Sequence, residues 1–372
     1  MKAIGIILAG GNNNRMKELT AKRAVPALPV AGSFRSIDFA LSSMSNSHIQ
    51  TVAVLTQYNA RSLNEHLSSS KWWNFGRKQG GLFLFTPTVT ADNSDWYMGT
   101  ADAMYQNIDF LKRRHEPYVI ISSGDCVYKL DFNRVLDFHI EKKSDITVVC
   151  KDMMYNDDVS RFGVVRMDDE SRITEFDEKP IEALSNTIST GIYVIRRRQL
   201  IELLEAAAEE NRFDFVNDIL VRYKNVKKIY GYKINSYWNN IADIDAYFKT
   251  NMDFLRPDVR SYFFREEPTI CSKVDDLPPA KFNPGSDISN SLVSSGCIIN
   301  GSVEDSVLFK QVFVGKNTTV KNCVILNDVY IGDNVHLENC IVESRGTINP
   351  NTCYCGEDGV MIVKEKNVRY VI

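Results

Sequence analysis

The sequence predicts an α/β domain with a mainly parallel sheet, followed by a parallel β-helix. Two observations lead to this fold class. From residue 1 to about residue 250, strand-like and helix-like segments alternate, which is the pattern of an α/β sandwich. After residue 285, short apolar segments recur with a spacing of 17 residues, and a repeat of this kind is typical of stacked coils.

The length of 372 residues favours two folded units over a single core. We expect the first domain at residues 1–250, a linker at 251–285 and the β-helix at 286–372. The linker is indicated by Arg256 and Pro257 and by the stretch DDLPPAKFNPGSD, because proline disfavours a helical residue before it and marks turns.

The first strand is expected at residues 3–8, an apolar run that ends at Gly10 and Gly11. An apolar run bounded by glycine is typical of a strand that is buried on both faces of a parallel sheet. Glycines at the carboxyl end of such a strand allow the backbone to approach a ligand and to point its amides at phosphate. With Arg15 following, the segment is predicted to bind phosphate, and the alternative is a turn followed by a solvated basic loop.

The remaining elements of the first domain follow from the same alternation of patterns. Further strands are predicted at residues 51–56, 118–122, 145–150, 163–167, 191–195 and 227–234. Helices are predicted at residues 35–47, 59–67, 101–113, 131–142 and 199–210.

Two further segments lie where this fold would place a ligand. The strand in PYVIISSGDCVY ends at Gly124 and Asp125, so this carboxylate is expected at the same edge as the first loop, where it could hold a divalent cation. Its alternative role is to cap the next helix. Gly99 and Thr100 precede a helix whose N-terminus could receive a base or a phosphate, although Thr100 could equally cap that helix.

The repeat is clearest in the segments FVGKNTTVKNCVILND and YIGDNVHLENCIVES. Four positions match in register, which predicts that each coil stacks its inward side chains on the next. The buried cysteines are then expected to act as small hydrophobic residues inside the coils. The matching pairs are Gly315 and Gly332, Asn317 and Asn334, Asn322 and Asn339, and Cys323 and Cys340.

Composition argues against several classes of partner. The formal net charge is −3, so no general attraction to nucleic acid or to an anionic membrane is expected. No signal peptide or membrane span is recognisable, so we expect a cytoplasmic protein whose eight cysteines are reduced. Cys353 and Cys355 are close in sequence, but two thiols alone make a poor zinc site, and no structural metal is expected there.

Eight motifs along the chain resemble bacterial ADP-glucose pyrophosphorylase, also called glucose-1-phosphate adenylyltransferase, a family of sugar-1-phosphate nucleotidyltransferases. In order, they are ILAGG, RAVPALP, IDFALSS, WYMGTADA, SGDCVY, FDEKP, STGIYV and YWNNIADIDAY. The resemblance implies a Rossmann-like, GT-A-like first domain and a left-handed β-helix of the hexapeptide type. It also implies the Mg²⁺-dependent conversion of ATP and glucose 1-phosphate to ADP-glucose and pyrophosphate in glycogen biosynthesis.

The resemblance also assigns roles to single residues. Catalysis of this reaction depends on in-line positioning and on neutralising phosphate charge. Arg15 would hold the triphosphate and Asp125 the Mg²⁺ ion. The nucleotide would contact Leu8, Gly10, Gly11, Gly99 and Thr100. The sugar phosphate would contact Glu178, Lys179, Thr190 and Gly191. The alternative for the sugar side is that Glu178 and Lys179 form an ordinary surface ion pair and that Thr190 is an ordinary strand residue.

The chain departs from the family pattern at several of these positions. Asn13 and Asn14 stand in place of the glycine and threonine of the phosphate loop, and Val25 stands in place of a lysine that faces the triphosphate. Cys126 replaces a histidine, and Asn240 replaces the second aspartate that binds the metal. Losing the lysine removes a charge-assisted contact to phosphate, and an asparagine contributes no charge to a metal site.

This pattern of losses resembles the GlgD-type regulatory subunit of the family. We therefore expect a chain that is catalytically weak or inactive alone and that activates a catalytic GlgC-type partner in a heterotetramer, with a homo-oligomer as the other possible assembly. Two alternatives stay open. The chain could itself be an active sugar-1-phosphate nucleotidyltransferase, or it could be a sensor that binds glucose 1-phosphate or nucleotide without chemistry.

Overall fold

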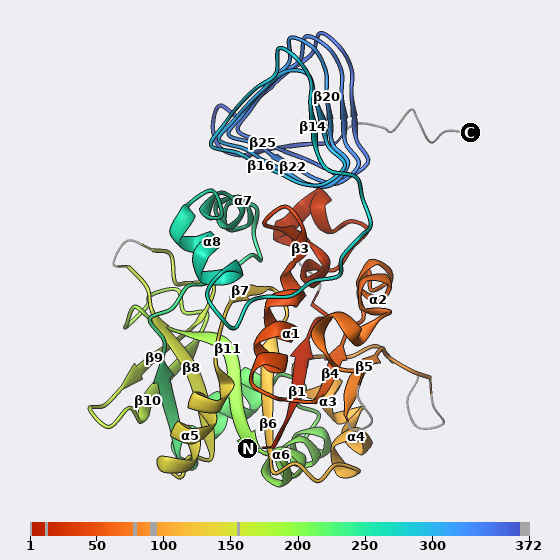
Figure 1. Cartoon of the computed structure of the whole chain (residues 1–372). Coiled ribbons are helices and arrows are strands. Elements are labelled where there is room, and N and C mark those ends of the chain that lie inside the picture. Colours follow the sequence, from red (N-terminus) through yellow and green to blue (C-terminus); the bar gives the residue numbers. More distant parts are fainter. Residues whose placement is uncertain (1, 12–13, 77–79, 90–94, 155–156, 365–372) are drawn as a thin grey trace.

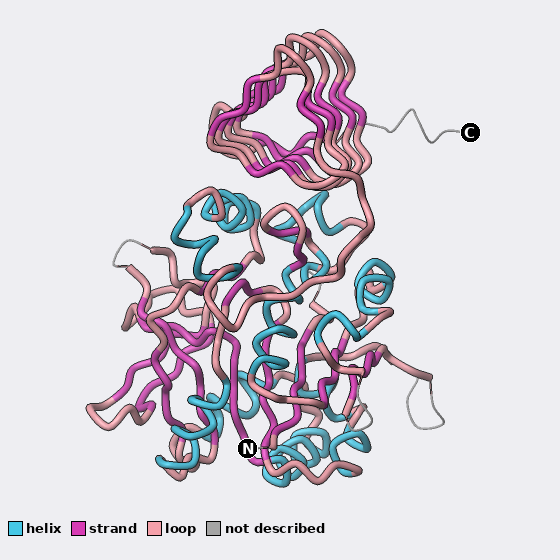
Figure 2. The backbone as a smooth tube through the Cα atoms, in the orientation of Figure 1, coloured by secondary structure: helices cyan, strands magenta, loops and turns pink. Residues whose placement is uncertain are grey.

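The computed structural model describes residues 2–11, 14–76, 80–89, 95–154 and 157–364. An α/β domain carries a triangular β-helix, with helices α7 and α8 lying on the side of the domain that faces the β-helix (Figure 1). Both halves of the predicted fold class are therefore confirmed, and the β-helix stacks its strands as three parallel sheets (Figure 2).

The centre of the α/β domain is the strand β1 (Ala3–Leu8), which pairs in parallel with β4 (Thr51–Leu55) and β6 (Tyr118–Ser123). Its side chains alternate between two hydrophobic clusters, because successive residues of a strand point to opposite faces. Ile7 packs in one cluster and Ile6 in the other. The burial of β1 on both faces is therefore confirmed.

The main sheet has nine strands in the order β10-β9-β11-β6-β1-β4-β5, and β8 joins β11 to β12. Every predicted strand is present, with ends shifted by a few residues, and β5 and β10 are strands that the pattern did not predict. The other bounds are β5 Gly81–Phe85, β8 Ile146–Asp152, β9 Gly163–Met167, β10 Ile173–Glu178, β11 Thr187–Arg196 and β12 Ile229–Lys233. Two short pairs complete the domain, β2 Pro29–Val30 with β3 Phe34–Arg35 and β7 Cys126–Tyr128 with β13 Trp238–Asn240.

Helices cover both faces of this sheet (Figure 1). None of the described helices is long and apolar enough to cross a membrane.

The prediction of one helix over residues 101–113 is wrong, because the helix breaks at Asn107. The Asn107 side chain donates to the Tyr97 hydroxyl and to the Ala103 carbonyl, both at 2.9 Å. The helices are α1 Ser36–Asn46, α2 Arg61–Leu67, α3 Thr100–Tyr105, α4 Ile108–Lys112, α5 Phe132–Glu141, α6 Arg197–Glu209, α7 Ile244–Asp253 and α8 Pro257–Phe264. Shorter turns are η1 Asn14–Thr20, η2 Val25–Ala27, η3 Ser70–Trp73 and the π-type η4 Val216–Val221.

The segment expected to be a linker, residues 251–285, contains helical structure. Pro257 begins α8, where its missing N–H costs nothing because the first amides of a helix have no partner within the helix. Phe263 of this helix is fully buried and packs against Phe254. At the other end, β14 (Lys281–Phe282) already pairs with the next coil of the β-helix. Extended chain is therefore confined to the part between α8 and β14.

Each face of the β-helix is a five-stranded parallel sheet. The first sheet contains β14, β17 Ile298–Ile299, β20 Phe313–Val314, β23 Tyr330–Ile331 and β26 Thr347–Ile348. The second contains β15 Asp287–Ser289, β18 Ser302–Glu304, β21 Thr319–Lys321, β24 His336–Glu338 and β27 Cys353–Cys355. The third contains β16 Leu292–Val293, β19 Val307–Leu308, β22 Val324–Ile325, β25 Cys340–Val342 and β28 Met361–Val363.

Asparagine side chains link successive coils at the predicted spacing. Asn317 donates to Asn334 at 3.2 Å, and Asn334 donates to Asn351 at 3.1 Å. All three have a positive φ, which asparagine tolerates better than most residues. Cys323 and Cys340 are fully buried inside the coils, so their predicted role as small hydrophobic residues is confirmed.

We predict that Ile299→Ala destabilises the β-helix far more than Ile298→Ala. The two residues are neighbours on β17, but Ile299 is 0% exposed and Ile298 is 38% exposed. Truncating a fully buried isoleucine costs about 2–5 kcal/mol through lost burial and a residual cavity. Urea unfolding of both variants would measure this difference, and equal losses of stability would contradict the assignment of inner and outer faces.

Candidate functional site

The tips of β1 and β6 are joined at the carboxyl edge of the main sheet. The Gly124 amide donates to the Leu8 carbonyl at 3.0 Å, and the Ser36 hydroxyl donates to the Gly124 carbonyl at 2.9 Å. The ring of Pro26 lies against Gly124, where an added Cβ would be 3.0 Å from Cγ. The first loop and the Asp125 loop therefore meet at one edge, as the parallel sheet predicted, and the RAVP segment also lies there.

The first loop contains Gly10, Gly11 and Arg15. Neither glycine has a positive φ, and a Cβ at Gly11 would meet nothing within 4 Å, so the described backbone does not require glycine at that position. Asn13 lies outside the described residues, and Asn14 is exposed at the start of η1. Arg15 is exposed on η1.

Asp125 and Asn240 lie side by side because β7 pairs with β13. Asn240 is opposite Cys126 in this pair, and the Ile241 amide donates to the Asp125 carbonyl at 2.9 Å. The Ser123 hydroxyl donates to Asp125 Oδ1 at 2.5 Å, which fixes the carboxylate. The two positions that the family resemblance associates with the metal are thus brought together by the fold.

These side chains are a poor donor set for Mg²⁺, which prefers several oxygen ligands and carboxylate charge. Asp125 is the one carboxylate of the pair. The carbonyl oxygen of Asn240 already accepts the Ala242 amide at 3.0 Å. Burial, followed by the charge of Asp125, raises the pKa of the Cys126 thiol well above its usual value, so this side chain stays neutral. The expected Mg²⁺ ion therefore fits this donor set poorly.

Arg161 is a charged neighbour of this site that the sequence motifs did not identify. It forms an ion pair with Asp243, whose carboxylate also caps α7 by accepting the Ala246 amide at 2.7 Å. Burial lowers the pKa of the Arg161 guanidinium, the charge of Arg15 lowers it further, and the charge of Asp125 raises it. An arginine in a loop carries no motif, so only the fold could place this cation beside the remaining carboxylate.

Val25 lies where the family resemblance expects a lysine, and its side chain is only 4% exposed. It belongs to a hydrophobic cluster that also contains Leu28 and Phe39. Val127 and Ile241, which neighbour Cys126 and Asn240 in sequence, are part of the same cluster. The residues that pack below the candidate site around Val25 are therefore apolar.

The sugar-side residues come from β10 and β11. Lys179 Nζ lies 3.0 Å from Glu178 Oε1, and the lysine side chain is 60% exposed, so this pair contributes little to stability. The Thr190 hydroxyl is buried and donates to the Val149 carbonyl at 2.8 Å, as expected of an ordinary strand residue. Gly191 has φ of 74° within a bulge of β11, and an added Cβ would lie 3.4 Å from Ser123 Cβ. The bulge thus lies next to the Asp125 loop.

A backbone carbonyl already lies at the start of α3, where Gly99 and Thr100 are predicted to receive a base or a phosphate. The Phe213 carbonyl accepts the Ala101 amide at 2.7 Å and occupies the helix N-terminus. Gly99 is the residue before the helix, so Thr100 does not cap it either. Instead, the Thr100 hydroxyl accepts the Phe215 amide at 2.9 Å and holds the segment before η4 against α3.

Two cavities lie elsewhere in the domain. One of about 490 Å³ lies between the end of α1 and the segments that contain Trp72 and Cys271, and one of about 510 Å³ lies between β5 and α4. None of the predicted site residues lines either cavity.

Comparison with known proteins finds similarity along most of the chain. The family model described as "Nucleotidyl transferase" matches residues 4–256, and the one described as "GlmU-like, C-terminal hexapeptide" matches residues 278–362. Glucose-1-phosphate adenylyltransferase of Geobacillus stearothermophilus is 39% identical over 365 residues, covering 97% of this chain and 94% of that protein. Proteins of the same name from Clostridium novyi and Bacillus subtilis are 38% and 36% identical, covering 85% and 86% of this chain and 84% of each relative.

We predict that Gly99→Ala destabilises the protein, whereas Gly11→Ala does not. A Cβ at Gly99 would lie 2.4 Å from the Phe213 carbonyl oxygen, and this backbone contact can be relieved only by moving two segments apart. The expected cost is about 2 kcal/mol or more, against about 0.5 kcal/mol or less for Gly11→Ala. Thermal unfolding would compare the variants, and a fully stable Gly99→Ala protein would contradict this account.

Proposed function

Because the chain belongs to the glucose-1-phosphate adenylyltransferase family, we propose that it is a GlgD-type regulatory subunit. It is catalytically weak or inactive by itself, and it raises the activity of a catalytic partner subunit that converts ATP and glucose 1-phosphate to ADP-glucose and pyrophosphate. The names of the relatives supply the reaction. The regulatory role is our inference from the chain's own side chains.

The observation that carries this proposal is the burial of Val25. A transferring phosphoryl group needs cations that neutralise its developing charge, and a lysine at this position would supply one. Val25 instead contributes its side chain to the apolar cluster with Leu28 and Phe39. A triphosphate on this side would lose a charge-assisted contact, and each such contact is worth about 1.5–3 kcal/mol.

The metal side supports the same proposal. One carboxylate, Asp125, faces an amide, Asn240, whose oxygen is already engaged by a backbone N–H. The Arg161 guanidinium lies close enough to interact with Asp125, which makes a second cation beside that carboxylate less favourable. Loss of positive charge on the triphosphate side and loss of negative charge on the metal side both weaken catalysis of phosphoryl transfer.

The β-helix offers a surface suited to a partner subunit. On the outer face of the first sheet, the rings of Phe313 and Tyr330 stack with their centroids 4.7 Å apart, and Ile298 is 38% exposed beside them. Aromatic side chains are enriched in subunit interfaces, where they bury large areas. We therefore place the subunit contact on this face.

We expect the purified chain, assayed alone with ATP, glucose 1-phosphate and Mg²⁺, to make little or no ADP-glucose. Mixed with a catalytic subunit from the same source, it should raise that subunit's rate, because the proposed role is regulatory. Release of pyrophosphate measures the rate of the chain alone and the rate of the mixture. Turnover by the chain alone at about 1–1000 per second would contradict the proposal and favour an independent enzyme.

A restoring variant tests the cause of the expected inactivity. We expect Asn13→Gly, Asn14→Thr, Val25→Lys and Asn240→Asp together to raise activity about tenfold or more over the unaltered chain. Val25→Lys and Asn240→Asp return charge to the two sides of the site, and the other two substitutions restore the uncharged residues of the family loop. Melting curves and activation of the partner would check that the variant folds.

The control adds Asp125→Ala to the restoring variant, which should abolish the gained activity if the reaction uses this site. A folded restoring variant with no gain would show that these positions do not account for the missing activity.

A further inference from the structure

Four side chains able to bind metal share one outer face of the last coils of the β-helix. The strands β24 and β27 pair in parallel, with His336 opposite Cys353 and Glu338 opposite Cys355. The residue between the two ligands of β24, Leu337, is fully buried in the β-helix core. Because side chains alternate along a strand, the flanking residues of both strands point outward on the same side.

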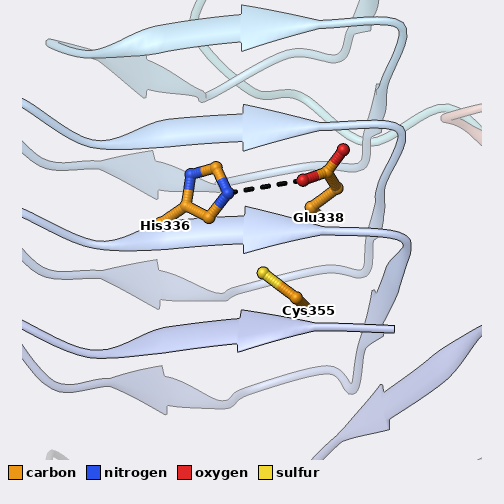
Figure 3. Close-up of side chains that lie close together, drawn as sticks. All are labelled: His336, Glu338 and Cys355. Atoms are coloured by element: carbon orange, nitrogen blue, oxygen red, sulfur yellow. Dashed lines mark ion pairs between the residues drawn. The ribbon is translucent and has the colours of Figure 1, made fainter. Parts of the chain in front are cut away.

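The side-chain atoms are already close to one another. His336 Nε2 lies 3.5 Å from Glu338 Oε2, and Cys353 Sγ lies 3.6 Å from Cys355 Sγ. The ligand atoms of His336, Glu338 and Cys355 lie within 4.8 Å of one another (Figure 3). Cys353 is not part of this group of three, and its sulfur is near that of Cys355. The His336 and Glu338 side chains are 43% and 40% exposed, so the cluster is accessible from solvent.

Two of these separations are close to those of neighbouring ligands around a tetrahedral ion. With Zn–S bonds of about 2.3 Å, two sulfurs of a tetrahedral site lie about 3.8 Å apart, and with shorter Zn–N and Zn–O bonds the nitrogen and oxygen lie about 3.4 Å apart. The observed values of 3.6 Å for the sulfurs and 3.5 Å for the nitrogen and oxygen are close to both. An ion could therefore be bound on this pair of strands once the Cys353 side chain turns toward the other three ligands.

We propose that His336, Glu338, Cys353 and Cys355 form a zinc site that clamps the last coil of the β-helix to the coil before it. The donor set selects the ion, because thiolate and imidazole favour Zn²⁺, whereas Mg²⁺ and Ca²⁺ favour oxygen ligands. This proposal replaces the expectation of no metal at the two cysteines. Their spacing in sequence could not reveal the histidine and the glutamate, which the fold brings in from the preceding coil.

The position in the fold gives the ion a structural role. β27 is the last strand of its sheet, so among the described residues it pairs with β24 alone. Terminal repeats of a solenoid lack a neighbour on one side and need added stabilisation. The same outer positions of the preceding strand, β21, are Thr319 and Lys321. The ligand set is therefore a local feature of the terminal coils and not a property of the repeat.

Zinc binding by the full-length chain tests the proposal. The reduced protein is stripped with a chelator and titrated with Zn²⁺ against a competing chromophoric chelator, and with Co²⁺ as a spectroscopic probe. We expect one Zn²⁺ per chain, and Co²⁺ absorption bands typical of tetrahedral thiolate ligation. Zn²⁺ should also raise the melting temperature, because a ligand that binds only the folded state stabilises it.

Cys355→Ser and His336→Ala should each weaken Zn²⁺ binding at least about tenfold, since even outer hydrogen-bond partners of a metal site contribute about 10–100-fold. Glu338→Gln keeps the side-chain shape and should weaken binding without unfolding the coil. The matched control is Cys271→Ser, which removes an exposed cysteine of the segment between α8 and β14 and should leave binding unchanged.

Two results would overturn the proposal. One is Zn²⁺ affinity in the unaltered chain no higher than in the Cys353→Ser, Cys355→Ser double variant. The other is a mass lower by two hydrogens in the protein purified without reductant, with the bond mapped to Cys353 and Cys355 and no metal bound after reduction. Both results are independent of adenylyltransferase activity, so they leave the proposed regulatory function untouched.

Discussion

The parallel pairing of β1 with β6 is the constraint on which the rest of the candidate site depends. Parallel neighbours end at the same edge of a sheet, so the loop after Leu8 and the loop at Asp125 must emerge together. The hydrogen bond from Gly124 to Leu8 then fixes their separation. The short pair β7 and β13 extends this edge and adds Asn240 to it. The positions associated with chemistry are therefore kept in place whether or not the side chains there can perform it.

The sequence predicts much of this arrangement because its signals are local or periodic. Apolar runs of strand length identify the central strands, and the spacing of 17 residues identifies the β-helix, since each coil repeats the same inward positions. The predictions that fail involve competing local interactions. Asn107 interrupts a pattern that is periodic over residues 101–113, because its amide makes side-chain hydrogen bonds that a continuous helix would not provide. Pro257 looks like a linker signal, yet a first helical position accepts proline equally well.

The residues of the candidate site can be predicted from the sequence only where each lies within a recognisable motif. Asp125 and Asn240 are found in this way, and the fold brings them together. Gly99 and Thr100 are assigned to a ligand because a helix follows them, but the carbonyl that occupies this helix start belongs to Phe213, more than a hundred residues later in the chain. Arg161 has no motif at all, and its interaction with Asp243 depends on tertiary structure. Long-range partners of this kind cannot be deduced from spacing.

The cluster that buries Val25 has a mechanical consequence. The same cluster contains Phe309 and Leu326 of the β-helix, so apolar side chains of both domains form one continuous packed unit. Any rotation of the β-helix against the α/β domain would expose part of this surface, at a cost of about 25 cal/mol per Å². The shared packing therefore resists rotation of one domain against the other. A partner that bound the β-helix as proposed would contact a unit that is packed directly against the domain of the candidate site.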